Sequence, residues 1–271
     1  MIDVDEWTFE GTQVPIVARS WRDSAVAPRF VALIVHGYGE HIGRYDHVAA
    51  ALIANGAVVY GVDHIGHGKS GGERALVSNF DDVVADVHSV AATARAQWPD
   101  LPVVLVGHSM GGMIGARYAQ LHGDELNAVV LSGAAIGNFD LLEQLLALDP
   151  LPDIPLDPSI LSRDPAVGDA YAADPLVWHG PFKRPTLAAM AATVATINGG
   201  QSLGELPLLW VHGADDQLVP IEGTRAGIEG LRGATFEQHA YPGARHEIFN
   251  ETNADEVLAD VNAFIDEVLF G

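Results

Sequence analysis

The sequence predicts an α/β fold in which helices cover both faces of a mostly parallel, eight-stranded sheet. Short continuous apolar runs recur along the chain without alternating polar residues, as expected for strands that are buried on both faces. Amphipathic helical patterns lie between these runs. Of the 271 residues 48% are hydrophobic and only 18% are charged. The chain can therefore bury a large core, and disorder is not expected.

Seven segments have the composition of strands, and most of them are runs of Val, Leu, Ile and Ala. They are residues 14–18, 30–35, 57–62, 103–106, 128–131, 207–211 and 235–240. Two stretches, 80–94 and 257–269, carry apolar residues at the i, i+3, i+4 and i+7 positions of a helix. Each of these helices presents one apolar stripe that can cover the sheet.

A long segment, residues 136–206, interrupts this alternation and contains no clear strand. It includes a proline-rich stretch at 150–155 and a helix-like stretch at 185–197. An insertion between two strands is expected to lie over their carboxyl ends, where open α/β sheets bind ligands. We therefore expect a helical cap (lid) at 136–206, over a core made of 1–135 and 207–271. This segment contains one apolar stripe, which either core packing or an exposed lipid-facing patch would explain equally well. The stripe consists of Phe139, Leu141, Leu142, Leu145, Leu146 and Leu148.

A candidate nucleophile follows the strand at 103–106. The chain there reads Gly107-His108-Ser109-Met110-Gly111, and a helical pattern begins directly afterwards. Gly-x-Ser-x-Gly in a strand–turn–helix context is typical of the nucleophile in the α/β-hydrolase fold. Its sharp turn exposes the serine hydroxyl at a helix N-terminus, where the helix dipole favours negative charge. We therefore expect Ser109 to be the nucleophile.

Serine needs a general base, and in this fold the order along the chain is serine, acid, histidine. Two adjacent acids, Asp215 and Asp216, follow the strand at 207–211 and compete for the acid position. We favour Asp216, because its spacing from Gly213 places it beyond the strand end, where a loop can turn it inward. His246 lies in a loop after the last strand and is the expected base. The other histidines considered lie in motif loops or strands: His36, His64, His67, His108, His212 and His239.

Two backbone amides should form the oxyanion hole that binds the developing negative charge. The amide of Met110, directly after the nucleophile, is one candidate. The second should come from the glycine-flanked loop after the strand at 30–35, where Tyr38 is the expected donor.

Several classes of function are excluded. With no cysteine, the chain has no disulfide, thiolate metal site or cysteine nucleophile. Its net charge of −22 disfavours nucleic acid and anionic membranes as partners. Gly68-Lys69-Ser70 resembles the end of a phosphate-binding loop, but Asp63 stands where that motif needs glycine. His64 and His67 lack a third metal ligand.

We find neither the features of a signal peptide nor an apolar run of about 18 residues, and expect a cytoplasmic protein.

Five segments resemble the motifs of monoacylglycerol lipases, with the closest likeness to bacterial, particularly actinobacterial, members. They are residues 36–45, 63–70, 107–112, 213–220 and 243–251. The resemblance extends from about residue 30 to the end and is weakest at 136–206. It implies the same nucleophile, acid and base, and no cofactor or metal.

The resemblance also implies a small lipid ester as substrate, cleaved from monoacylglycerol to glycerol and fatty acid. Glu40 and Arg44 would then shape the glycerol end of the pocket, although an ion pair that braces the loop explains them equally well. In this family the cap can touch lipid surfaces transiently. The alternatives are a short- or medium-chain carboxylesterase, a lysophospholipase, a proline-type aminopeptidase and a non-catalytic binding module. The aminopeptidase would need acidic groups to hold the N-terminal amine of its substrate.

Overall fold

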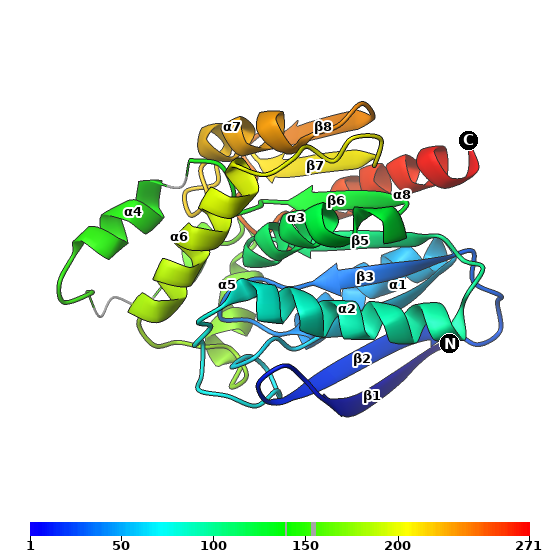
Figure 1. The fold of residues 1–271 in the computed structure, drawn as a ribbon, viewed down its shortest axis with the longest axis horizontal. Coiled ribbons are helices and arrows are strands. Elements are labelled where there is room, and N and C mark those ends of the chain that lie inside the picture. The colour runs from blue at the N-terminus through cyan, green and yellow to red at the C-terminus, as the bar shows by residue number, and fades with distance from the viewer. Residues whose placement is uncertain (139, 153–155) are drawn as a thin grey trace.

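The fold is built around one eight-stranded sheet (Figure 1). The computed structural model describes residues 1–138, 140–152 and 156–271. The strand order is β1-β2-β4-β3-β5-β6-β7-β8. The strands are β1 (Ile2–Glu10), β2 (Pro15–Asp23), β3 (Phe30–Val35), β4 (Ala57–Val62), β5 (Val103–His108), β6 (Ala128–Ser132), β7 (Leu208–Gly213) and β8 (Phe236–Tyr241). Neighbours from β4 to β8 pair in parallel, whereas β2 is antiparallel to both β1 and β4. The predicted α/β-hydrolase fold with a mostly parallel sheet is confirmed.

Helices cover both faces of the sheet, because the central strands are apolar on both sides. In β3, Val31 and Leu33 belong to the core that contains α2 and α3, whereas Ala32 and Ile34 belong to the core with α1 and α8. Figure 1 shows α2 and α3 on the near side of the sheet and α1 and α8 behind it. The helices of these two layers are α1 (Asp46–Ala54), α2 (Phe80–Gln97), α3 (Met110–His122), α7 (Ile221–Leu231) and α8 (Ala254–Phe270). Among the described residues, none of the helices has the length and apolar character needed to cross a membrane.

Strand β1 is absent from the sequence prediction. It forms one edge of the sheet and pairs only with β2. Trp7 and Phe9 are half-buried against the core, but Thr8 between them is exposed. An edge strand with one partly covered face needs few apolar residues, so no continuous apolar run marks it. The alternation of Trp7 and Phe9 with polar residues is the signal that could have identified it.

Between β6 and β7 the described residues form only helices and loops. The helices are α4 (Asp140–Ala147), α5 (Pro165–Ala173) and α6 (Arg184–Asn198), and short 3-10 helices occur at Ile42–Tyr45, Gly123–Glu125, Pro158–Ile160 and Ile248–Asn250. In Figure 1, α4 and α6 lie beyond the arrowheads of the parallel strands. Phe139 of the apolar stripe and residues 153–155 of the proline-rich stretch lie outside the described residues. In the rest of the stripe, Leu142 is buried in the core, whereas Leu148 is 47% exposed.

Candidate active site

Ser109 lies in a sharp turn between β5 and the first residue of α3. Its backbone angles, φ 57° and ψ −120°, fall in a region that residues other than glycine rarely adopt. The turn is possible because the adjacent glycines permit close backbone contacts. A Cβ atom at Gly111 would collide with the carbonyl oxygen of Val35, and one at Gly107 would collide with that of Gly111. The strained turn places the Ser109 hydroxyl at the carboxyl edge of the sheet.

The loop after β8 brings His246 to Ser109. The Nε2 atom of His246 lies 2.9 Å from Oγ of Ser109, and its Nδ1 atom lies 2.7 Å from Oδ2 of Asp216. If Nδ1 donates its hydrogen to the carboxylate, Nε2 is free to accept the hydroxyl hydrogen of Ser109. All three side chains are at least nine-tenths buried. The structure therefore brings together the three residues that the sequence predicted.

Asp216, and not Asp215, points toward His246. The side chain of Asp216 is buried, whereas Asp215 is exposed. Oδ1 of Asp216 accepts hydrogen bonds from the backbone amides of Leu218 and Val219, at 2.9 and 2.8 Å. This turn after β7 orients the carboxylate inward.

The electrostatics of Asp216 and His246 depend on each other. Burial by itself would raise the pKa of Asp216, but the neighbouring His246 and His212 outweigh it and hold the pKa well below its ordinary value. Burial opposes the positive charge of His246, but the carboxylate of Asp216 outweighs this effect and raises the pKa of His246. The imidazole is therefore a stronger base than a free histidine.

His212 is a neighbour of Asp216 that the sequence prediction did not use. Its Nδ1 atom accepts a hydrogen bond from Nε1 of Trp210 at 3.1 Å, so its hydrogen is on Nε2. That nitrogen lies 2.8 Å from the carbonyl oxygen of Val219 and 3.3 Å from Oδ2 of Asp216. The i, i+4 spacing of His212 and Asp216 across the strand end could have indicated this contact.

The loop after β3 lies directly against Ser109. A Cβ atom at Gly37 would be 3.2 Å from Cβ of Ser109. The amide of Gly37 donates to Oε1 of Glu40 at 2.6 Å. Within the described part of the chain, neither the amide of Tyr38 nor that of Met110 donates to a protein acceptor. Both amides remain available for an oxygen atom bound next to Ser109.

Glu40 and Arg44 form a buried ion-pair network with Glu247. Arg44 donates to Oε2 of Glu40 at 2.6 Å and to both carboxylate oxygens of Glu247 at 2.8 Å. The hydroxyl of Tyr45 donates to Glu40 at 2.7 Å. Burial would raise the pKa of Glu247, but Arg44 outweighs it and lowers this pKa. Because its guanidinium is engaged by two carboxylates, Arg44 is better placed to brace the loop after β3 than to contact a substrate. Glu40 also lines the cavity that is described next.

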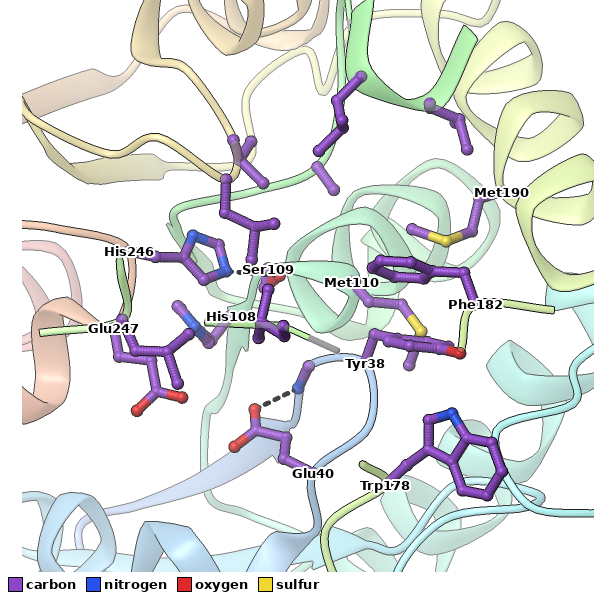
Figure 2. A pocket seen from close by; sticks show the side chains of 18 of the residues that line it. Tyr38, Glu40, His108, Ser109, Met110, Trp178, Phe182, Met190, His246 and Glu247 are labelled. Atoms are coloured by element: carbon purple, nitrogen blue, oxygen red, sulfur yellow. Dashed lines mark hydrogen bonds between the residues drawn. The ribbon is translucent and has the colours of Figure 1, made fainter. Parts of the chain in front are cut away.

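Ser109 lies in a cavity whose empty space, including its open mouth, amounts to about 1010 Å³. Figure 2 shows His246, Glu247 and His108 on one side of Ser109, Met190, Phe182 and Met110 on the other, and Glu40 below. The apolar side is extended by residues from the segment between β6 and β7 and from the loop after β7: Leu141, Leu142, Leu145, Leu156, Leu161, Leu187 and Leu218. The cavity thus has a polar end near Ser109 and His246 and a predominantly apolar remainder.

Three of the buried histidines near the site are held neutral. Burial, aided by the neighbouring His246, lowers the pKa of His108 to about 3, and Nδ1 of His108 lies 3.0 Å from Oγ of Ser132. Burial also lowers the pKa of His64 to about 3 and that of His67 to about 4. These side chains pack around the loop after β3.

One group of described side chains has the arrangement of metal ligands. It consists of His88, His122 and Glu125, whose ligand atoms lie within 4.8 Å of one another. The guanidinium of Arg95 bonds to the carboxylate of Glu125 and lies 3.3 Å from Nε2 of His88. Because Arg95 already supplies the positive charge, this group is a surface ion-pair cluster.

Known proteins similar to this chain are hydrolases. The family described as "Serine aminopeptidase, S33" matches residues 26–253. The chain is 40% identical to the monoacylglycerol lipase of Mycolicibacterium smegmatis over 96% of each protein. It is 32% identical to the monoglyceride lipase of Mus musculus over 92% of this chain and 86% of that protein.

Solved structures agree with these relatives. A thermostable carboxyl esterase from Bacillus coagulans, solved in complex with glycerol, matches with a TM-score of 0.84 at 26% identity, covering 98% of this chain and 99% of that one. The monoacylglycerol lipase of Paleococcus ferrophilus matches with a TM-score of 0.73 at 26% identity over the same shares. The chain is therefore a serine hydrolase of the α/β-hydrolase fold and belongs to the monoacylglycerol lipase family.

Proposed function

We propose that this enzyme hydrolyses monoacylglycerol to glycerol and fatty acid through an acyl-enzyme on Ser109. The observation that carries the proposal is the chain of contacts from Ser109 through His246 to Asp216 at the polar end of an apolar cavity. A fatty acyl chain suits the apolar side, and the glycerol hydroxyls suit the polar side.

In the proposed reaction, His246 takes the proton of Ser109 while Oγ attacks the ester carbonyl carbon. The tetrahedral oxyanion accepts hydrogen bonds from the amides of Tyr38 and Met110. His246 then gives its proton to the leaving glycerol oxygen as the acyl–oxygen bond breaks. Water, activated by the same imidazole, attacks the acyl-enzyme and releases the fatty acid. Asp216 keeps His246 in the required tautomer and stabilises its charged form.

We assign residues 136–206 to a cap over a core formed by 1–135 and 207–271. This division is supported by the absence of strands among the described residues of the segment and by its contribution to the cavity wall, for example Leu142, Phe182 and Met190. The exposed Leu148 offers one apolar contact for a lipid surface. The net charge of −22 directs such contact toward uncharged lipid.

The description of the matching family suggests a peptidase as an alternative function. An aminopeptidase needs unpaired carboxylates to hold the N-terminal amine of its substrate. Glu40 and Glu247 line the cavity, but both are ion-paired with Arg44. A free amine would have to compete with Arg44 for these carboxylates, so we favour the ester as substrate.

The proposal is tested with a substrate panel. Monoacylglycerols of increasing acyl length are assayed beside diacylglycerol, triacylglycerol, lysophosphatidylcholine and an aminoacyl-naphthylamide. We expect monoacylglycerols to have the highest kcat/KM and the naphthylamide to be inert. A higher kcat/KM for lysophosphatidylcholine or for the naphthylamide would overturn the assignment of substrate. The mechanism is tested separately by the Ser109 variant discussed below.

A further inference from the structure

The segment from Tyr171, near the end of α5, to Phe182, just before α6, is tied to the loop that follows β3. The backbone amide of Trp178 donates to the carbonyl oxygen of Gly39 at 2.7 Å. The ring of Tyr38 stacks on that of Phe182, with centroids 5.1 Å apart and planes 22° from parallel. Figure 2 shows Tyr38 between Phe182 and Trp178 beside the cavity. The two segments lie more than a hundred residues apart in the chain, so tertiary contacts alone join them.

His41 makes the third contact between these segments. Its Nδ1 atom accepts a hydrogen bond from the amide of Gly43 at 3.2 Å, so its hydrogen is on Nε2. Nε2 donates to Oδ2 of Asp174 at 2.8 Å. The His41 residue is only 8% exposed. A partly buried hydrogen bond of this kind, from an imidazole to a carboxylate, holds its two partners in one geometry.

Asp174 organises the turn that carries Trp178. Its Oδ1 atom accepts a hydrogen bond from the amide of Leu176 at 2.8 Å, and its carbonyl oxygen accepts one from Val177 at 3.2 Å. Burial would raise the pKa of Asp174, but the hydrogen bond from His41 and that from Leu176 outweigh it and lower this pKa. The carboxylate is therefore ionised near neutral pH and keeps both donors. Holding Asp174 in place thus holds the amide of Trp178 in place.

The amide of Tyr38 lies between two tethered peptide groups. On one side, the amide of Gly37 is held by Glu40 at 2.6 Å. On the other side, the carbonyl of Gly39 is held by Trp178. Gly39 has a φ of +76°, and a glycine there leaves the backbone free to rotate unless something outside the loop restrains it. Both tethers are needed to fix the direction in which the Tyr38 amide points.

We propose that His41 is a positioning residue for the oxyanion hole, acting through Asp174 and Trp178 on the amide of Tyr38. The inference rests on the proposed function, in which that amide binds the oxyanion. It follows that the part of the cap from Tyr171 to Phe182 belongs to the catalytic structure and not to a mobile cover. Because the oxyanion forms only in the transition state, loss of this contact affects kcat and leaves ground-state binding largely intact.

The test compares His41→Ala and Asp174→Ala with the wild-type enzyme on p-nitrophenyl acetate and on a medium-chain p-nitrophenyl ester. Removing one oxyanion donor from a hydrolase costs about 10²–10³ in kcat, so its misplacement should cost at least about tenfold. We expect that loss with both esters, with KM changed by less than about twofold. His41→Gln, whose amide can still donate to Asp174, should recover most of it. Asp169→Ala, an exposed acid on α5, is the matched control and should match the wild type.

A second measurement separates positioning from general damage to the fold. A trifluoromethyl ketone forms a tetrahedral adduct with a catalytic serine and presents an oxyanion. Its affinity should fall by the same factor as kcat in His41→Ala, while a non-reactive alcohol analogue binds unchanged. The double variant of His41→Ala and Asp174→Ala should lose little more kcat than either single variant, because both substitutions remove the same hydrogen bond.

Two outcomes would overturn the inference. One is a folded His41→Ala or Asp174→Ala enzyme whose kcat stays within twofold of the wild type. The other is an unchanged affinity for the trifluoromethyl ketone in whichever variant folds. Ser109→Ala separates this result from failure of the proposed function. If Ser109→Ala is inactive while both positioning variants retain full kcat, only the role of His41 is refuted.

Discussion

Oγ of Ser109 lies 2.9 Å from Nε2 of His246, although 137 positions separate the two residues along the chain. The contact exists because β5 and β8 end at the same edge of one sheet, with β6 and β7 between them. The loop after each strand then needs to reach only a short distance across that edge. Carboxyl ends of parallel strands are where this architecture assembles sites from distant segments.

Replacing Ser109 by alanine should abolish ester hydrolysis. Without the hydroxyl no acyl-enzyme can form, and kcat on p-nitrophenyl butyrate should fall by at least about 10⁴-fold. Labelling by a fluorophosphonate probe should be lost as well. The temperature of unfolding serves as the control and should stay close to that of the wild type. Turnover by a folded Ser109→Ala enzyme would refute the mechanism.

The two adjacent acids provide a matched pair of variants. Asp216→Asn removes the charge that holds and stabilises His246, and kcat should fall by about 10⁴-fold, as such a change does in a Ser-His-Asp protease. Asp215→Asn changes an exposed side chain and should leave kcat within twofold of the wild type. Equal losses in the two variants would mean that Asp216 has no special role.

The pH profile of kcat/KM should show one acid limb that belongs to His246. Activity requires a neutral imidazole, and Asp216 raises the pKa of His246 in spite of burial. Activity should therefore fall as the pH drops through an inflection above about 6.5, the ordinary value for histidine. In the residual activity of Asp216→Asn, this inflection should move to lower pH, because the opposing negative charge is gone. An inflection that stays in place would assign the acid limb to a different group.

Arg44→Met should destabilise the fold strongly. It leaves the carboxylates of Glu40 and Glu247 buried without their cation, which typically costs about 3–5 kcal/mol of unfolding free energy. Lys69→Met is the control, because both side chains of the ion pair it breaks are exposed to solvent, Lys69 by 46% and Glu6 by 36%. Exposed pairs contribute about 0–1 kcal/mol. Urea unfolding measures the free energy of unfolding of both variants. Similar losses of this free energy in the two variants would contradict the bracing role of Arg44.

Two glycine-to-alanine changes should have opposite effects on stability. At Gly111 the added methyl group would collide with the backbone of Val35, so the nucleophile turn would have to shift. Gly111→Ala should lower both kcat and the unfolding temperature. At Gly230, in the last turn of α7, no atom outside the adjoining helix backbone lies within 4 Å of the added carbon, and alanine should stabilise the helix by up to about 1 kcal/mol. A neutral Gly111→Ala would contradict the close packing described for the turn.

Much of the sheet could be predicted because its central strands are apolar on both faces. Residues 30–35, predicted as one strand, coincide with β3, and residues 57–62 coincide with β4. Strand β1 was missed because an edge strand with one partly covered face does not need such a run. Helix α5 was missed as well, since only Tyr171 along it is buried and no apolar stripe marks it.

The site was predictable to the extent that local backbone geometry demands particular residues. The glycines around Ser109 are needed for the turn itself, and the order of serine, acid and histidine follows from the order of the strands. The contact of Arg44 with Glu247 spans 203 positions and leaves no local pattern, so the partners of Arg44 could not be read from the chain.

The sequence by itself determined the central strands of the sheet, the nucleophile turn and the two loops that carry Asp216 and His246, because these depend on contacts between near neighbours in the chain. Only the tertiary structure decided that His41 reaches Asp174 and that Arg44 reaches Glu247. Both outcomes depend on the direction in which a short loop leaves a strand or helix. That direction is set by hydrogen bonds and packing from segments far away in the chain, such as the contact between Trp178 and Gly39.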